Sequence, residues 1–397
     1  MEAIELLGSH LEEFCPMIHK TRLESVLEVA TALQHSKNLS LTAMGRQVEG
    51  SASMKHKIKK VDRLEGNKHL HEELSRLYSG LSDYVFKYVS NESKLPILID
   101  LCYIKDSHEV QMLSAEVALK GRSIPLYRDV FRSGDLKGRA SCFLSNLSLC
   151  LPKSAVVIVI MDAGFGKDWF SEIESYQWYW LSRIREGKKI KVAPSSDWCT
   201  VKELIPEIGT RAKSYNNASI MIKHDLECRI VTKKKSSKNT KSGYKRQPRN
   251  YNAGNGSYQR SAKEPWILAT NLPPSAYTTT KVINYYTQRM QIEESFRDLK
   301  SHQFGLGARY ARTSSIERWG VKMLLAAIVQ IVFWIIGIIG HSQSFQKIFQ
   351  ANTVKNKKIF SYFYLGKLIF EHDMLDKLLI DYEKLPNIID AELARKW

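Results

Sequence analysis

The sequence has few cysteines, and none of them forms a recognisable metal or redox motif. The six cysteines among 397 residues include no CxxC pair and no Cys/His grouping with zinc-ligand spacing, which argues against a zinc site. The opening residues, MEAIELLGSHLEEF, are acidic and lack the basic segment with which a secretory signal begins. We therefore expect a protein of the reducing cytoplasm.

Acidic residues are outnumbered. There are 41 Asp and Glu against 59 Lys and Arg, which gives a formal charge of +18. A chain with this much positive charge repels itself unless a polyanion is near. Nucleic acid is therefore the first candidate partner and an anionic membrane surface the second. With 44% hydrophobic and 25% charged residues the chain can bury a core, so global disorder is excluded.

Long hydrophobic runs are also scarce. The single candidate is Met323 to Gly340, in which Gln330 is the one polar residue. Its 18 residues reach only the lower limit for a membrane span. Because no other segment is typical of a membrane protein, we predict a helix buried in an α/β core and no membrane partner, with a membrane anchor as the alternative.

The hydrophobic pattern divides the chain into helical and strand-rich regions. Apolar residues recur at helical spacing up to about residue 90. Beyond it the pattern predicts strands at 96–104, 155–162 and 178–190, a hairpin within 111–130, and helices at 136–149, 169–175, 281–301 and 316–339. This order resembles a ribonuclease-H-like α/β core that is interrupted by a β-rich insertion and preceded by an all-α N-terminal DNA-binding domain.

We expect five regions. They are a helical DNA end-binding domain (1–90), the first part of the core (91–195), the insertion with a basic loop (196–275), the second part of the core (276–345) and a helical C-terminal region (346–397). Between Lys233 and Lys263 the insertion has ten Lys and Arg residues and no acid. Tyr244, Tyr251 and Tyr258 lie among these charges, which favours DNA contact over a solvated linker.

Two aspartates end apolar strand patterns. Asp100 closes PILID and Asp162 closes VVIVIMD. A carboxylate beside a buried strand is costly unless it is paired, hydrogen-bonded or bound to a metal. The two strands therefore suggest one shared site, although each aspartate could also simply open a turn.

A third acid lies in a helical pattern. Tyr286, Arg289, Glu293 and Lys300 follow one another at steps of 3, 4 and 7, which places them on one face of the predicted helix. The carboxylate suits a metal ion, and the basic groups suit phosphates. The alternative is a solvated face with Arg289 and Glu293 as an ion pair.

This spacing resembles the YREK signature of a large family of bacterial insertion-sequence DDE transposases. The resemblance implies that Asp100, Asp162 and Glu293 are catalytic and bind two Mg²⁺ ions, with Mn²⁺ as a substitute. It also implies nicking at the transposon end, hairpin formation and opening, and joining to target DNA within a homodimeric complex. Tyr286, Arg289 and Lys300 would bind phosphates. Trp266 would stack on a base flipped out of the hairpin, its alternative being an ordinary core residue.

Residues 38–67 are typical of a helix-turn-helix-like unit. We expect Ser40 to cap one helix and Ser53 to cap a second, which would bury Met54, Ile58 and Val61. The second helix carries a basic stripe at i,i+4 spacing: Lys55, Lys59 and Arg63. We predict that the second helix enters a DNA groove, an ordinary amphipathic hairpin being the alternative. The family resemblance implies that this region recognises the terminal inverted repeats.

The leading hypothesis is therefore a DNA transposase. The alternative enzyme is a ribonuclease-H-like DNA nuclease that performs no strand transfer. A DNA-binding relic without catalysis is disfavoured because all three acids are present.

Overall fold

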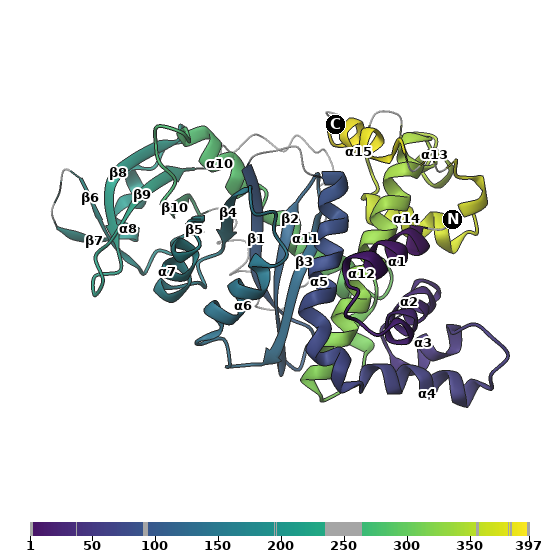
Figure 1. The fold of residues 1–397 in the computed structure, drawn as a ribbon. Coiled ribbons are helices and arrows are strands. Elements are labelled where there is room, and N and C mark those ends of the chain that lie inside the picture. The colour runs from purple at the N-terminus through teal and green to yellow at the C-terminus, as the bar shows by residue number, and fades with distance from the viewer. Residues whose placement is uncertain are drawn as a thin grey trace, which may run out of the picture. The chain divides into compact units, whose positions relative to one another are not determined.

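The computed structural model describes residues 3–36, 38–89, 94–193, 195, 197–234, 264–354, 357–379, 381 and 383–394. Tyr244, Tyr251, Tyr258 and nearly all of the basic loop predicted to contact DNA lie outside the described residues. The chain forms two compact units, shown in Figure 1. Unit 1 comprises Met1–Val157 and Gln288–Trp397, and unit 2 comprises Ile158–Thr287.

The described residues before position 90 are helical, as predicted. Their helices are α1 (Ala3–Phe14), α2 (Lys20–His35), α3 (Leu41–Gln47), α4 (Met54–Glu65) and α5 (Lys68–Val89). Apolar side chains on their inner faces, such as Leu7, Val26 and Leu77, are fully buried. These helices belong to the same compact unit as the first three strands, so a separate N-terminal domain stays a prediction.

The helix-turn-helix-like pair differs in part from the prediction. Ser40 caps α3, because its hydroxyl accepts a hydrogen bond from the Ala43 backbone N–H at 3.3 Å. Ser53 precedes α4 but its side chain makes no capping hydrogen bond. Met54 is 47% exposed, so the prediction that it is buried was wrong. The reason is that α4 buries Val61, Leu64 and Glu65 of its second half, while its first turn faces solvent. Ile58, also predicted to be buried, is half-buried.

The sheet of unit 1 is an antiparallel meander in the order β3-β2-β1. Its strands are β1 (Lys94–Tyr103), β2 (Val110–Ala118) and β3 (Ser123–Arg132). Gly121 turns the hairpin between β2 and β3 with a φ of 85°, where a side chain would be strained. Helix α6 (Arg139–Ser148) follows. The predicted first strand, hairpin and helix are thus confirmed.

The long apolar helix, α12 (Ile316–Ser342), is the core of unit 1. It is the one helix among the described residues that is long and apolar enough to cross a membrane, and its most apolar window is wholly buried inside the protein. It packs closely on α14 (Tyr362–Glu371), where a Cβ on Gly337 would lie 1.8 Å from the Tyr362 carbonyl oxygen. The remaining elements of this part are α11 (Met290–Lys300), η2 (Ala308–Tyr310), α13 (Gln346–Phe349), η3 (Leu375–Lys377) and α15 (Leu385–Ala394).

Unit 2 contains a mixed sheet in the order β4-β5-β10-β9-β8-β6-β7, in which β4 and β5 are parallel. Its strands are β4 (Val156–Met161), β5 (Tyr179–Arg183), β6 (Lys189–Val192), β7 (Trp198–Thr200), β8 (Lys213–Ile220), β9 (Leu226–Lys233) and β10 (Trp266–Thr270). Its helices are α7 (Lys167–Ser175), α8 (Val201–Leu204), η1 (Ile205–Glu207) and α10 (Thr279–Thr287). The predicted α/β class is confirmed.

Two predicted elements are divided in the structure. The strand expected at 178–190 is β5 followed by β6, because the chain turns at Arg185, whose carbonyl accepts from the Lys188 N–H at 3.0 Å. The helix expected at 281–301 is α10 followed by α11. At that break the Thr287 hydroxyl binds the Asn284 carbonyl at 2.5 Å, an interaction that competes with the helical backbone ladder.

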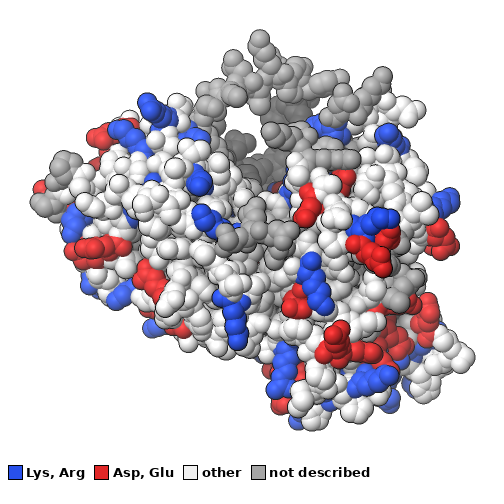
Figure 2. Space-filling view, turned by 45° about the horizontal axis from the view of Figure 1, so that its top comes forward, with Lys and Arg blue, Asp and Glu red and all other residues white. Residues whose placement is uncertain are grey.

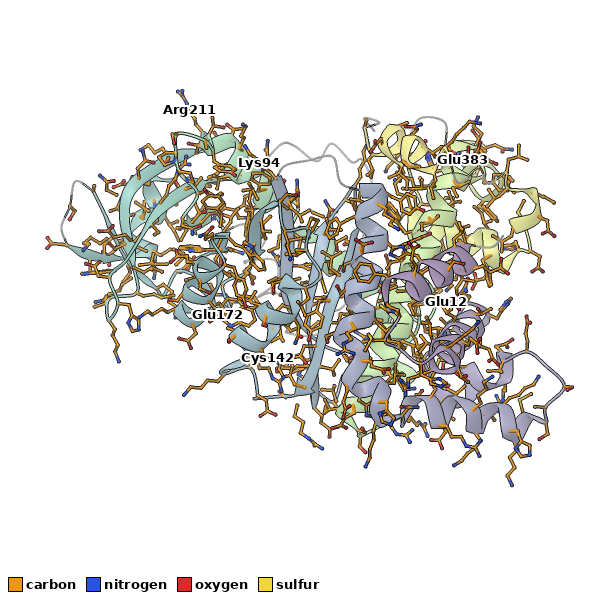
Figure 3. The ribbon with its side chains drawn as sticks, viewed as in Figure 1. Glu12, Lys94, Cys142, Glu172, Arg211 and Glu383 are labelled. Atoms are coloured by element: carbon orange, nitrogen blue, oxygen red, sulfur yellow. The ribbon has the colours of Figure 1, made fainter. Side chains whose placement is uncertain are left out.

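All six cysteines are free thiols, and Cys142 is the exposed one (Figure 3). Burial raises the pKa of Cys102 and Cys150 to about 12, which makes these thiols unreactive. On the face in Figure 2, basic and acidic side chains of the described residues are interspersed. The charge excess is therefore spread over this face and not gathered in one patch.

Candidate active site

Asp100 lies inside β1, opposite Ser114 of β2. The preceding strand residues, Leu98 and Ile99, are fully buried, while the Asp100 side chain is 17% exposed. Its Oδ1 atom accepts a hydrogen bond from the Leu101 backbone N–H at 2.8 Å. The strand thus presents a carboxylate from a largely buried position, where its charge needs a partner.

Arg289 provides that partner and joins Asp100 to Glu293. Its Nη1 atom lies 3.2 Å from Asp100 Oδ2, and its Nη2 atom lies 2.5 Å from Glu293 Oε1. Glu293 is in the first turn of α11, where the partial positive charge of a helix start favours a carboxylate. The side chain of Arg289 is only 12% exposed, so one guanidinium balances two carboxylates in a partly dry setting.

A hollow of about 720 Å³ opens beside this pair within unit 1. Asp100 and Glu293 line it together with basic and polar side chains: Arg297, Lys300, His302, Arg309 and Tyr310. The Lys300 ammonium donates to the Tyr103 carbonyl oxygen at 3.3 Å, which holds it at the end of β1. The two carboxylates lie side by side and basic side chains surround them, so the hollow can accept a phosphate group next to the carboxylates.

Asp162 directly follows β4 in unit 2. The Tyr286 hydroxyl donates to its Oδ1 atom at 3.5 Å, which is long for a hydrogen bond. Arg185 lies 3.6 Å from its Oδ2 atom and is 71% exposed. The Asp162 carboxylate, 27% exposed, therefore has weaker partners than Asp100 and Glu293 have.

Trp266, the first residue of β10, is half-buried, and the edge-on contact of its ring with Tyr286 places the two ring centroids 5.2 Å apart. The same Tyr286 ring is almost fully buried. Unit 2 thus brings Asp162, Tyr286 and Trp266 together, and unit 1 brings Asp100, Arg289, Glu293 and Lys300 together. Within the described ranges, no group of three or more His, Cys, Asp and Glu residues forms a cluster that could hold a metal ion.

The predicted YREK face differs from the structure in one respect. Tyr286 belongs to α10, whereas Glu293 and Lys300 belong to α11 and Arg289 forms the N-cap of that helix. The four residues therefore do not share one face of a single helix. The predicted Arg289–Glu293 pair exists, but Arg289 also binds Asp100 and is not a surface residue.

The basic stripe on α4 is exposed, as predicted. Lys59 is bound to Asp62 Oδ2 at 3.0 Å, and Arg318 binds the other oxygen of Asp62 at 2.9 Å. These two cations lower the pKa of Asp62, with the Lys59 hydrogen bond as the larger cause. Lys55 and Arg63 complete the stripe on the same helix.

Comparison with known proteins bears on this site. Residues 147–329 match the family model described as a transposase DDE domain. No curated protein matches the chain. The matched range contains Asp162, Trp266 and the segment from Tyr286 to Lys300, whereas Asp100 precedes it. The match covers less than half of the chain, and over this range the chain is similar to a transposase DDE domain. The mixed α/β fold is compatible with the ribonuclease-H-like core of such enzymes.

Proteins with a transposase DDE domain generally use divalent metal ions, and two carboxylates of unit 1 suit such an ion. Asp100 and Glu293 offer oxygen ligands to one hollow, and oxygen is the donor that Mg²⁺ prefers. Their shared contact with Arg289 shows that the pair already requires a positive charge. Within unit 1 the residues therefore suit a hard cation.

Some residues of the site were not predicted from the sequence. Arg185 contacts Asp162, and Arg297, His302 and Arg309 line the hollow beside Asp100. Arg297 lies on the same helix as Glu293, so a search for cations on that helix could have suggested it. Arg185 lies on a turn that was expected to be strand, and no sequence pattern marked it.

Proposed function

We propose that this protein is a cut-and-paste DNA transposase. It binds the terminal inverted repeats of its insertion sequence, hydrolyses the phosphodiester at each end, forms and opens a hairpin, and joins the 3′ ends to target DNA. The observation that carries the proposal is the Arg289-bridged pair of Asp100 and Glu293 in a hollow lined by cations. Residues 289–301 and 305–320 resemble the transposase of the tetracycline-resistance composite transposon, as do the stretches around Asp100, Asp162 and Trp266.

The proposed chemistry assigns the three acids to two Mg²⁺ ions, for which Mn²⁺ can substitute. Asp100, Asp162 and Glu293 would hold them. When bound, such ions neutralise charge on the phosphate and activate a water or a 3′-hydroxyl. The surrounding cations, Lys300 among them, bind the phosphates of the DNA end and orient the scissile bond.

Arg289 has a dual role in this proposal. In the structure it neutralises Asp100 and Glu293. With metal held by the two carboxylates, the Arg289 guanidinium would be released from them and would bind a phosphate of the strand. Tyr286, whose hydroxyl lies 3.5 Å from Asp162, would bind a phosphate in the same way.

Trp266 is proposed as the platform for a base extruded during hairpin formation. Its ring is half-buried and rests edge-on against Tyr286, so one side is supported. Stacking on such a ring holds an unpaired base without regard to its identity. The alternative is that Trp266 only packs β10 within unit 2.

The exposed stripe of α4 is proposed to bind the inverted repeats through Lys55, Lys59 and Arg63. The complete reaction needs two ends, so we propose a homodimer in the complex that holds them. The protein would work in the bacterial cytoplasm on the nucleoid. The alternative function is a ribonuclease-H-like DNA nuclease without strand transfer, and a joining assay with labelled target DNA distinguishes the two.

The test is cleavage of DNA carrying the inverted repeats that bracket the gene. Asp100→Ala, Asp162→Ala and Glu293→Ala should each abolish Mg²⁺-dependent nicking and leave end binding intact. Ca²⁺ should permit binding without cutting, because it accepts looser geometry than Mg²⁺. The matched control is Glu172→Ala, a half-buried acid of α7, which should nick normally. Near-normal nicking by any of the three variants would remove that residue from the site.

A further inference from the structure

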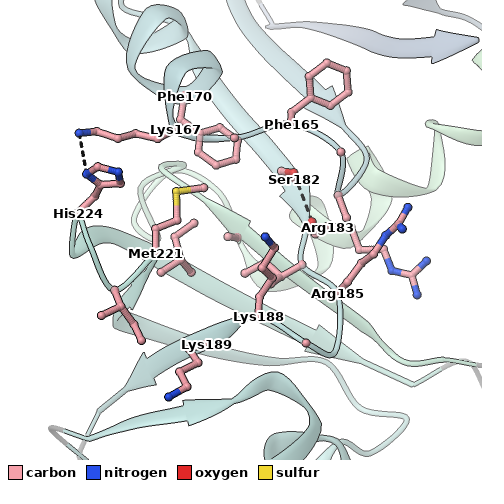
Figure 4. Close-up of a pocket in the computed structure, with 18 of the residues that line it drawn as sticks. Phe165, Lys167, Phe170, Ser182, Arg183, Arg185, Lys188, Lys189, Met221 and His224 are labelled. Atoms are coloured by element: carbon pink, nitrogen blue, oxygen red, sulfur yellow. Dashed lines mark hydrogen bonds between the residues drawn. The ribbon is translucent and has the colours of Figure 1, made fainter. Parts of the chain in front are cut away.

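A second hollow, of about 520 Å³, lies within unit 2 and has no role in the function proposed above. It is formed by the loop after β4, the start of α7, the turn between β5 and β6 and the turn between β8 and β9 (Figure 4). Neither Asp162 nor Trp266 nor Tyr286 lines it. This hollow is therefore distinct from the proposed site residues of unit 2.

The charge of this hollow is of one sign. Six cationic residues line it, and no acidic residue is among the described lining residues: Lys167, Arg183, Arg185, Lys188, Lys189 and Lys223. Arg183 is paired with Glu264 at 2.8 Å. Figure 4 shows Lys167 and His224 on one side, Arg183 and Arg185 on the other, and Lys188 between them. Such a ring of cations attracts phosphate groups.

The wall of the hollow is apolar. Phe165, Phe170, Ile184 and Met221 line it, and Phe170 is held in place by stacking on Trp180 at a centroid distance of 4.3 Å. An apolar wall beneath a cationic rim suits a ligand that has a flat apolar part and an anionic part. A volume of this size holds much more than a lone phosphate.

Met221 is placed at the wall by an unusual backbone. Its φ is 62°, in the left-handed region that residues other than glycine seldom adopt. Its carbonyl accepts hydrogen bonds from the His224 and Asp225 N–H groups, at 2.7 and 3.0 Å, and these fix the turn. Strain of this kind gathers at binding sites, and a thioether adapts its shape to a flat partner.

We propose that this hollow binds an unpaired nucleotide of a DNA strand. The base would lie against Met221 and Ile184, and the adjoining phosphates would be bound by Lys188 and Arg185. Arg185 also lies 3.6 Å from Asp162, so the strand that leaves the hollow runs toward the proposed catalytic acid. The inference rests on the proposed function, because it takes DNA as the substrate, and adds a site for single-stranded DNA.

The experiment measures binding of the full-length protein to a labelled duplex with a short single-stranded overhang, and to the same duplex with a blunt end. The wild type should prefer the overhang. Lys188→Glu should reduce its affinity for the overhang about tenfold more than its affinity for the blunt end, because a phosphate contact is lost and its charge reversed. The matched control is Lys202→Glu, an exposed lysine of α8 outside the hollow, which should weaken both about equally.

A second variant tests the apolar wall and keeps the proposal testable if charge reversal harms folding. Met221→Asn preserves the backbone, since Asn tolerates the left-handed region, and removes the apolar contact. It should reduce overhang affinity about threefold to tenfold with unchanged melting temperature and unchanged blunt-end affinity. A fluorescent 2-aminopurine in the overhang should be quenched by the wild type and not by this variant.

Three results would overturn the proposal. One is an equal loss of blunt and overhang binding in Lys188→Glu, and another is an unchanged overhang preference in both variants. The third is competition by free deoxyadenosine monophosphate as strong as that by the overhang, which would mean a site for free nucleotides. Nicking of transposon ends is measured in parallel with the wild type. Absence of nicking would contradict the transposase proposal. The overhang-binding result alone decides whether the hollow binds single-stranded DNA.

Discussion

The acids of unit 1 and the acid of unit 2 are held in different ways. Asp100 and Glu293 share one guanidinium that is 12% exposed, at 3.2 and 2.5 Å. Asp162 has a phenol at 3.5 Å and a guanidinium that is 71% exposed at 3.6 Å. The first two carboxylates are neutralised within the protein, and the third is left to solvent and weak partners. The unit 1 pair should therefore depend strongly on Arg289, whereas Asp162 should tolerate the loss of either neighbour.

The largest expected effect concerns another acid of α11. Burial raises the pKa of Asp298 to about 6, although the Arg122 guanidinium, whose Nε lies 2.7 Å from the carboxylate, opposes the shift. In the unfolded chain an aspartate has a pKa near 3.9, so between about pH 4 and 6 the folded protein keeps a proton that the unfolded chain loses. The free energy of unfolding should fall by about 3 kcal/mol as the pH rises through this window and stay level above it.

Urea unfolding at a series of pH values checks this prediction against Asp298→Asn, which cannot ionise. The free energy of unfolding of the wild type, relative to that of the variant, should fall as the pH rises from 4 to 6. Parallel curves would show that Asp298 ionises normally. The result would compare two acids of the same helix, because in α11 Glu293 is accessible and Asp298 is buried.

The second effect tests the two arginines directly. Arg289→Ala should lower the free energy of unfolding by about 1–3 kcal/mol, since two partly buried carboxylates lose their shared partner. Arg185→Ala should lower it by less than about 1 kcal/mol, because its pair with Asp162 is solvent-exposed. Chemical denaturation of both variants measures the difference. Equal losses would break the comparison between the units.

A triple variant distinguishes loss of charge from loss of packing as the cause of the Arg289→Ala effect. In Arg289→Ala combined with Asp100→Ala and Glu293→Ala, most of the loss should be recovered, because no unpaired carboxylate remains. If the triple variant is as unstable as the sum of its parts, Arg289 acts through packing and not through charge.

The positions of these acids were partly predictable from the sequence. The apolar run before Asp100 predicts a strand, and the helical spacing around Glu293 predicts a helix; both elements are present. The bridge from Arg289 to Asp100 joins residues 189 positions apart, and no local pattern reports such a contact. The break between α10 and α11 was also missed, because it arises at Thr287 from a side-chain hydrogen bond that helical periodicity does not reveal.

The third effect concerns Trp266 in unit 2. If it supports an extruded base, Trp266→Ala should slow hairpin formation by about 5- to 150-fold and leave the first nick intact, as expected for the loss of one stacking contact. A gel time course on a pre-nicked end measures the step. An abasic nucleotide near the end should partly restore the rate. Equal loss of nicking and hairpin formation, with a lowered melting temperature, would make Trp266 a packing residue.

The smallest effect is expected from the α4 stripe. Lys55→Ala, Lys59→Ala and Arg63→Ala together should weaken end binding and reduce the slope of log affinity against log salt by up to about 2.7, since each lost phosphate contact removes about 0.9. Lys59 should contribute less than the other two, because Asp62 already binds it at 3.0 Å. A salt titration of the folded variant measures this. An unchanged slope would mean that α4 does not touch DNA phosphates.

The central proposal, that Asp100, Asp162 and Glu293 each act as a ligand of a catalytic metal ion, is tested most directly by changing the ligand atom. Asp100→Cys, Asp162→Cys and Glu293→Cys each replace a carboxylate oxygen with a sulfur, which Mg²⁺ avoids and softer ions such as Mn²⁺ accept more readily. Nicking of the transposon end is measured with each ion. The account predicts that the wild type nicks with both and that each variant is inactive with Mg²⁺ and regains nicking with Mn²⁺. A variant that nicks equally well with Mg²⁺ would contradict the metal-binding role of that residue.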